Sequence, residues 1–319
     1  MRPITVIIPV KPGGDVRALT ALQAAEYPTE LIEVIVAEGS WPSRQRNRAA
    51  VQAHGDIFYF LDDDSRVTPH HFSRVATWFA DPKVAAVGGP SLTPPDDSDW
   101  QHAFGCALAS PFGGGGVRNR YRKSGAPRST GDNELILCNL GFRREVFLGA
   151  GGLDERLYPN EENELMDRLL DEGYLLMHDP ELAILRSQRP SFSAFIRQLF
   201  GYGRGRAEQT RITGSVGIAS LVPSLFLVYL CLLPLRCNPV YSIPLLCYVL
   251  LTCAFALLEG VRAGRPASVV RLLAVFPALH LSYGAGLLAG MVRPRFRAAS
   301  GRSPDVTIRL VKEMGKPWT

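Results

Sequence analysis

The chain has 319 residues, 20% of them charged, and a formal net charge of +5 at pH 7. This length suits one large domain, or one domain with an appendage. The excess of basic residues is too small to indicate a nucleic-acid-binding protein, and we expect no nucleic acid among its partners.

The start of the chain does not read as a secretory signal. The apolar run Ile4–Val10 is short, and Lys11 and Pro12 follow it instead of a small-residue cleavage site. We therefore expect the first domain, residues 1–190, to remain in the cytosol.

Strand and helix patterns alternate along this domain. Apolar runs predict strands, with helical patterns between them that include a helix capped by Thr68 with Pro69 at its first position and a helix that ends near Gly55. The expected strands are Ile4–Val10, Ile32–Ala37, Ile57–Leu61 and Lys83–Val87, and the expected helices include Asp15–Tyr27 and Ser43–His54. This order indicates an α/β fold with a parallel sheet covered by helices.

Charged residues follow the expected strands. Lys11, Glu38 and the run Asp62–Asp64 fall at carboxyl ends, where open parallel sheets bind ligands. Three adjacent aspartates repel one another, and a solvated turn is one explanation. The other is a hard divalent cation, Mg²⁺ or Mn²⁺, held by carboxylate oxygens together with substrate phosphates.

Five motifs arrive in an order that resembles family 2 glycosyltransferases. They are VIIPVKPGG, VIVAEGS, SRQRNRAA with AHGDIFYFLDDDS, NLGFRREVFLGAGGLDE, and NEENELMDRLL. The resemblance covers about residues 5–211. It implies a GT-A nucleotide-sugar-binding, Rossmann-like fold and inverting transfer of a sugar from a nucleotide donor with Mg²⁺ or Mn²⁺.

The resemblance also implies roles for single residues. It places these residues at the donor: Pro9, Val10, Lys11, Glu38, Arg46, Asn47, Asp62 and Asp63. Asp64, with Asp62, would hold the metal. Lys11 and Ala37-Glu38 depart from the family's usual residues, so the base of the donor nucleotide is left open.

A general base is needed to take the proton from an acceptor hydroxyl. The run Asn160–Glu164 resembles the family's GEDxDL motif and puts the base at Glu162, with Glu161 as the alternative. An acidic first turn, favoured by the helix dipole, would give the same pattern without catalysis.

Two segments are expected to serve the acceptor side. Residues 90–131 read as a long flexible flap, in which Gly113–Gly116 is not a phosphate loop because no Gly-Lys-Ser/Thr follows. Residues 191–212 read as an interfacial amphipathic segment. Its arginines suit either a diphosphate or lipid phosphate, or a solvated helix face, and the QxxRW motif of processive synthases is absent.

Residues 213–292 predict two or three membrane helices. The windows Val216–Leu235, Cys237–Leu258 and Leu272–Val292 are each about 20 residues long, enough to cross a bilayer. Helices buried in a soluble protein are the alternative. Three crossings would place the basic tail, residues 293–319, outside, against the positive-inside rule. The six cysteines show no metal-ligand spacing and are expected to be reduced and structural.

Together these features predict a metal-dependent, inverting glycosyltransferase in the inner (cytoplasmic) membrane, with its catalytic domain on the cytosolic side. Its acceptor would be a lipid-linked saccharide in cell-surface polysaccharide or glycolipid synthesis. Two alternatives stay open: a polyprenyl-phosphate glycosyltransferase, and a non-catalytic membrane protein that binds nucleotide sugars. The sequence indicates neither the donor sugar nor the oligomeric state.

Overall fold

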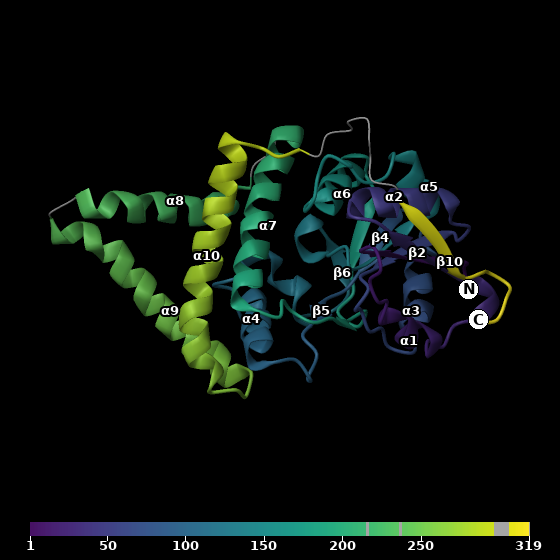
Figure 1. The fold of residues 1–319 in the computed structure, drawn as a ribbon, viewed down its shortest axis with the longest axis horizontal. Coiled ribbons are helices and arrows are strands. Elements are labelled where there is room, and N and C mark those ends of the chain that lie inside the picture. Colours follow the sequence, from purple (N-terminus) through teal and green to yellow (C-terminus); the bar gives the residue numbers. More distant parts are fainter. Residues whose placement is uncertain (215–216, 236–237, 297–305, 319) are drawn as a thin grey trace. The chain divides into compact units, whose positions relative to one another are not determined.

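The computed structural model describes residues 1–214, 217–235, 238–296 and 306–318. The chain forms two compact units (Figure 1). The first comprises residues 1–94 and 119–187 with the described part of 297–319, and the second comprises residues 95–118 and 188–296.

The first unit is built on an eight-stranded sheet in the order β10-β2-β1-β3-β7-β4-β8-β6. Its strands are β1 (Ile4–Val10), β2 (Ile32–Glu38), β3 (Ile57–Leu61), β4 (Val84–Gly88), β6 (Arg128–Thr130), β7 (Asn139–Arg143), β8 (Leu175–His178) and β10 (Thr307–Lys312). A separate parallel pair joins β5 (Ser91–Leu92) to β9 (Ile184–Leu185).

The sheet is mixed, whereas the sequence predicted a parallel one. β1 pairs in parallel with β2 and β3, as expected, but β7 lies antiparallel between β3 and β4. No strand was expected at Asn139–Arg143, because Asn139 and Gly141 interrupt its apolar pattern. Gly141 is required there by packing, since a Cβ would come within 2.8 Å of the Tyr59 ring.

Helices cover both faces of the sheet. On one face α1 (Ala18–Gln23) and α3 (His71–Trp78) pack against a set of alternate strand residues that includes Val6 and Tyr59. On the other face α2 (Pro42–Gln52), α5 (Arg144–Gly149) and α6 (Glu161–Asp171) pack against a set that includes Phe58 and Phe60. Successive strand residues thus enter two different cores, which explains why the central strands are apolar throughout.

Helix α1 runs only from Ala18 to Gln23 and is shorter than the expected helix Asp15–Tyr27.

Two other helix boundaries differ from the expectation. α3 begins at His71, so Thr68 is not its cap and only accepts a backbone hydrogen bond from the His71 N–H. Gly55 lies beyond the end of α2. Its lack of a side chain admits the backbone of Thr5, to which a Cβ would approach within 2.4 Å.

The C-terminal segment contributes the edge strand β10, which pairs antiparallel with β2 (Figure 1). Lys312 is 1% exposed, and its Nζ donates to the carbonyl oxygens of Thr29, Ile32 and Glu313. The basic tail expected at residues 293–319 therefore includes a strand of the sheet. Residues 297–305 of that tail lie outside the described residues.

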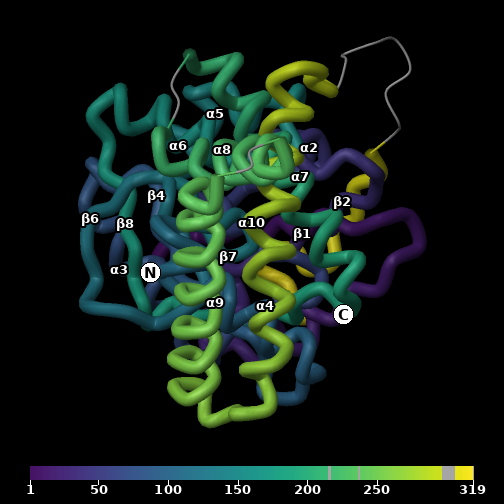
Figure 2. The backbone as a smooth tube through the Cα atoms, turned by 90° about the vertical axis from the view of Figure 1, so that its left-hand side faces the viewer, coloured from purple at the N-terminus to yellow at the C-terminus, as the bar shows by residue number. Residues whose placement is uncertain are grey.

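The second unit is helical. Its helices are α4 (Asp99–Ala109), α7 (Phe192–Thr213), α8 (Ile218–Leu232), α9 (Ile243–Arg262) and α10 (Ser268–Val292). Within this unit α10 packs most extensively against α7 and also contacts α8, α9 and α4. Helices α9 and α10 run next to each other in the view of Figure 2, whereas Figure 1 shows that they lie close at their connection and diverge from it.

Helix α4 lies in the segment that the sequence analysis took for a flexible flap, so that expectation was wrong. Ser98 caps the helix, and its side chain and that of Gln101 form a reciprocal capping box. The pattern Ser-x-x-Gln before an apolar run was visible in the sequence and signals a helix start.

The three apolar windows are helical. Within the described residues, Ile218–Leu235, Pro239–Arg262 and Ser268–Val292 are long and apolar enough to cross a membrane. Val216 and Cys237, which begin two of the predicted windows, lie outside the described residues. The five described cysteines are free thiols.

Candidate active site

The carboxyl ends of β1 and β2 are fastened together. Val10 pairs with Glu38, and Gln45 on α2 donates to the carbonyl oxygens of Val10 and Ala37 at 2.8 and 2.5 Å. Glu38 then accepts a hydrogen bond from the Gly13 N–H at 3.0 Å. The expected donor residues at both strand ends are thus neighbours, although the Lys11 side chain itself is exposed.

The aspartate run leaves the buried strand β3 in a tight turn. Ser65 N–H donates to the Asp62 carbonyl, and the Ser65 hydroxyl accepts from the Asp62 N–H at 3.2 Å. The Asp63 carbonyl accepts from the Ala18 N–H at the start of α1. The backbone of this turn is therefore held on both sides.

Arginine side chains neutralise the aspartates. Arg186 contacts Asp62 at 2.9 Å and Asp64 at 3.3 Å, so one guanidinium bridges the outer two carboxylates. Backbone hydrogen bonds between Arg66 and Leu185 bring the residue after β9 beside this turn. Arg17 lies further away, 3.9 Å from Asp64.

Arg46 joins the aspartate turn to the acidic start of α6. Its guanidinium donates to Asp62 at 3.1 Å and to Glu161 at 3.3 Å, and the whole residue is buried. Asp62 and Glu161 lie about a hundred residues apart in the sequence, and the structure brings them to one arginine.

Crowding and burial shift two carboxyl pKa values upward. For Asp63, burial raises the pKa most, the charges of Asp64 and Asp62 add to it, and Arg186 opposes it. For Glu161, burial and then the neighbouring Glu162 carboxylate raise the pKa to about 8, against the attraction of Arg46.

The two base candidates differ in their surroundings. Glu161 is 2% exposed and bound to Arg46, while its Oε2 atom is buried with no hydrogen-bond partner among the described residues. Glu162 is 9% exposed. A carboxylate that must meet an acceptor hydroxyl needs access, which Glu162 has to a greater degree.

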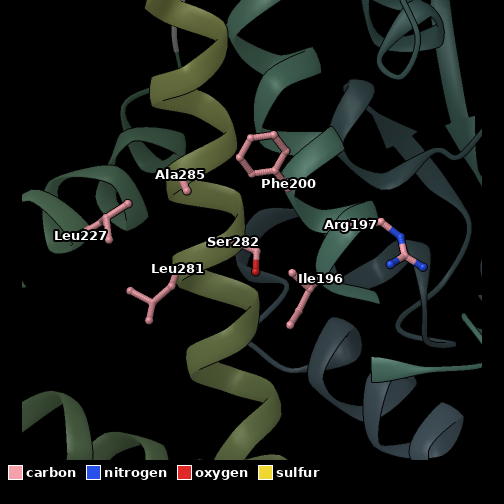
Figure 3. A pocket seen from close by; sticks show the side chains of 7 residues that line it. All are labelled: Ile196, Arg197, Phe200, Leu227, Leu281, Ser282 and Ala285. Carbon is pink, nitrogen blue, oxygen red and sulfur yellow. The ribbon is translucent and has the colours of Figure 1, made fainter. Parts of the chain in front are cut away.

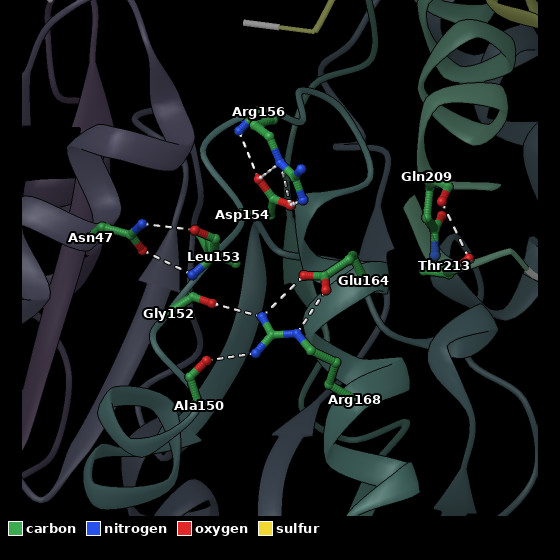
Figure 4. A network of polar contacts seen from close by, with 10 residues as sticks. All are labelled: Asn47, Ala150, Gly152, Leu153, Asp154, Arg156, Glu164, Arg168, Gln209 and Thr213. Carbon is green, nitrogen blue, oxygen red and sulfur yellow. Dashed lines mark hydrogen bonds and ion pairs between the residues drawn. The ribbon is translucent and has the colours of Figure 1, made fainter. Parts of the chain in front are cut away.

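Helix α6 is anchored behind these glutamates. It starts after Asn160, which has a left-handed backbone (φ 82°), and Arg168 pairs with Glu164 on the same helix. Arg168 also donates to the carbonyl oxygens of Ala150 and Gly152, at 2.5 and 3.0 Å (Figure 4). The first turn of α6 is thereby fixed to the segment that follows α5.

Asn47 was expected beside the nucleotide. Its amide instead donates to the Leu153 carbonyl at 2.8 Å and accepts from the Leu153 N–H at 3.0 Å (Figure 4). It also donates to Glu155 at 3.2 Å. These bonds make Asn47 a link between α2 and the loop before α6, and its contact with a donor stays a prediction.

The carboxylate oxygens of the aspartate turn are suitable ligands for a divalent cation whose other ligands are substrate phosphates. Asp62 and Asp64 converge on one cationic group, the Arg186 guanidinium, which shows that their oxygens can share a positive charge. Within the described residues no three His, Cys, Asp or Glu side chains are grouped to hold a metal ion by themselves. Mg²⁺ and Mn²⁺ do not require this, because one or two carboxylates suffice when substrate phosphates complete the shell.

Sequence reasoning missed two residues of this cluster. Arg186 follows a two-residue strand, and no motif marks it. Gln45 is part of SRQRNRAA but was not singled out, and a buried amide between two strand ends leaves no periodic signal.

The second unit holds an apolar pocket of about 460 Å³, lined by residues of α7, α8 and α10 (Figure 3). Its lining is Ile196, Arg197, Phe200, Leu227, Leu281, Ser282 and Ala285. Arg197 is the single charged residue among them.

Comparisons with known proteins identify the family of the chain. The family model described as glycosyl transferase family group 2 matches residues 57–259. The succinoglycan biosynthesis protein ExoA of Rhizobium meliloti (strain 1021) is 33% identical over 111 residues, which are 35% of this chain and 32% of that protein. The chain thus aligns with about a third of the length of this curated relative.

A solved structure shows the same fold. The mannosyltransferase PcManGT from Pyrobaculum calidifontis, in complex with GDP-Man and Mn²⁺, superposes with a TM-score of 0.55 at 14% identity. The match covers 91% of this chain and 87% of that one. The expected GT-A fold is confirmed, and because the family model spans most of the chain, the protein belongs to glycosyl transferase family group 2.

Proposed function

We propose that this protein is a metal-dependent, inverting glycosyltransferase, and that it moves a sugar from a nucleotide-sugar donor to a lipid-linked saccharide in cell-surface polysaccharide or glycolipid synthesis. The observation that supports this most is Arg46, which bonds both Asp62 of the donor-side turn and Glu161 beside the candidate base. Donor-side and acceptor-side carboxylates therefore belong to one cluster.

The donor would lie across the carboxyl ends of β1, β2 and β3. Val10, Lys11 and Glu38 would meet the base, and Asp62 and Asp63 the ribose and diphosphate. Asp64, with Asp62, would hold Mg²⁺ or Mn²⁺, which acts as a Lewis acid on the departing diphosphate. Arg186 would then turn from the aspartates toward the phosphates, for which its guanidinium is equally suited.

The transfer is a single displacement. The acceptor oxygen forms a bond to the anomeric carbon as the bond from that carbon to the diphosphate oxygen breaks, and the electron pair leaves with the nucleoside diphosphate. The hydroxyl proton passes to Glu162. Glu161, with its raised pKa, would stay protonated near neutral pH, and it positions Arg46.

The acceptor's lipid would be recognised by the second unit. The pocket has apolar walls that suit an acyl or polyprenyl chain, and Arg197, whose side chain points away from those walls (Figure 3), would meet the phosphate of the lipid at the edge of the pocket. We place the protein at the inner membrane with the first unit in the cytosol, consistent with the arginines that precede α8.

The test is nucleoside diphosphate release from a panel of nucleotide sugars by the purified protein in lipid. The assay would be run with Mn²⁺, with Mg²⁺ and with EDTA, with and without bacterial lipid extract. We expect release from one donor that is lost in EDTA and raised by the extract. Equal release in EDTA would refute metal dependence, and no stimulation by lipid would refute the acceptor class.

A further inference from the structure

The C-terminal strand restricts how the chain can cross a membrane. β10 belongs to the sheet of the first unit, where Leu310 pairs with Ile35 and Arg309 pairs with Val36. Val311 and Trp318 pack against the core of that unit, and Gly315 N–H donates to the Glu30 carbonyl. A folded unit of this kind lies wholly on one side of a bilayer, since its strand edges and charges need water or protein around them.

The second unit must therefore begin and end on the same side. The chain leaves the first unit after Ser187 and has rejoined it by Thr307. Between these points an even number of crossings is required. In the part of the chain that the structure describes, three helices are long and apolar enough to cross, so at least one of them does not.

The connection between α9 and α10 identifies the helix that does not cross. Arg271 pairs with Asp99 of α4 at 2.8 Å and Arg265 with the same carboxylate at 3.6 Å. Arg271 also lies over the Trp100 ring. Helix α4 belongs to the stretch 95–118, which leaves and re-enters the first unit and contains none of the three candidate spans. The α9–α10 connection is thus on the side of α4, which is the side of the first unit.

Helix α10 starts on that side and leads to β10 on that side. Its inner face is covered by protein, with 44% of its 18-residue apolar window buried against 6% for that of Ile218–Leu235 and 11% for that of Pro239–Arg262. It packs along α7 without intervening side chains, because Gly203 and Gly286 let the two backbones meet. Helix α7 is no membrane span, since it carries several arginines and the buried Glu208, which accepts from the Arg295 N–H.

We infer that α8 and α9 alone cross the bilayer, as a hairpin, and that α10 remains against α7 and α4 on the side of the membrane that holds the first unit, which we call the catalytic side. The two crossing helices present their apolar side chains outward, including Leu225, Leu246 and Leu250. With their flanking 3-10 turns they contain 18 and 24 residues, within the range of about 17–25 residues that crosses a hydrocarbon core.

The charge distribution agrees with this disposition. Arg236 is the only charged residue in the sequence between the two crossing helices. With two crossings, three groups of basic residues lie on the catalytic side, as the positive-inside rule requires. They are the arginines before α8, the arginines after α9 and the basic tail. The conflict that three crossings would create disappears.

Cysteine accessibility tests the inference without any substrate, so its result is independent of the proposed function. One variant retains Cys237, between the crossing helices, as its only cysteine. The others lack all six native cysteines and carry Val51→Cys on α2, Ala267→Cys between α9 and α10, or Thr307→Cys on β10, all at exposed positions. Each is labelled with a membrane-impermeant maleimide in sealed vesicles of one orientation, then in detergent as the measure of total reactive thiol.

We expect Val51→Cys, Ala267→Cys and Thr307→Cys to react from one side and Cys237 only from the other. If Thr307→Cys and Cys237 react from the same side, and Val51→Cys reacts from the other, the chain crosses three times and the inference is overturned. Labelling of Cys237 from the same side as Val51→Cys would mean that the hairpin does not cross, and would overturn it as well.

Discussion

The two units break the usual rules of a water-soluble protein in opposite ways. The first buries ionisable groups: Glu161 and Arg46 are almost inaccessible, and three aspartates share one turn. The second exposes apolar surface along α8 and α9. Each departure is costly in isolation, because buried charge loses hydration and exposed apolar surface orders water. A polar phosphate ligand would offset the first cost, and lipid would offset the second.

The comparison also shows how far each unit was predictable. Charged residues at strand ends and the apolar windows are patterns of consecutive residues, so the sequence indicated the fold, the aspartate turn and the membrane helices. The antiparallel β7, the edge strand β10 and Arg186 depend on contacts between distant segments. No periodicity in Thr307–Lys312 distinguishes a sheet edge from a solvated basic tail.

The largest expected effect concerns the first unit. Glu162→Gln removes the proposed base while keeping shape, and transfer should fall by about 10²–10⁴-fold, the usual contribution of general base catalysis. Donor affinity should be nearly unchanged. Glu172→Gln, at the far end of the same helix, is the matched control and should be fully active. Wild-type rates in Glu162→Gln would point instead to a phosphate oxygen as the nucleophile.

A second prediction concerns the packing of helices in the second unit. Gly286→Ala would place a Cβ 2.0 Å from the Phe200 carbonyl oxygen on α7, and should lower the free energy of unfolding by about 1–3 kcal/mol. Gly201→Ala, which meets nothing within 4 Å on the same pair of helices, should raise it by about 0.5–1 kcal/mol. Thermal denaturation in detergent compares them, and equal shifts would contradict the close contact of α7 and α10.

A smaller effect is expected from Arg186. Arg186→Ala removes the cation that bridges Asp62 and Asp64, so Mn²⁺ should bind the donor-free protein about threefold to tenfold more tightly, equivalent to roughly 1 kcal/mol for one partly buried ion pair. Calorimetric titration with Mn²⁺ measures this. Arg189→Ala, three residues further along the chain, is the control. Weaker Mn²⁺ binding in Arg186→Ala would show that the arginine supports the metal site instead of competing for it.

The last prediction is a pH dependence of stability. The pKa of Glu161 is raised from 4.5 to about 8, so the fold favours its neutral form. As pH rises from 4.5 toward 8 the unfolded chain ionises while the folded one does not, and the wild type loses stability over that window. The Tm of Glu161→Gln minus that of the wild type should therefore grow between pH 4.5 and 8. A difference that stays constant with pH would contradict the raised pKa.

The central claim is that the aspartate turn binds a nucleoside diphosphate through a divalent cation. The most direct test is calorimetric titration of nucleoside diphosphates into the purified protein with Mn²⁺ and with EDTA, for the wild type and for Asp64→Ala. We expect binding of one nucleotide in Mn²⁺ that is lost in EDTA and lost in Asp64→Ala. Binding of equal affinity in EDTA, or in Asp64→Ala, would contradict it.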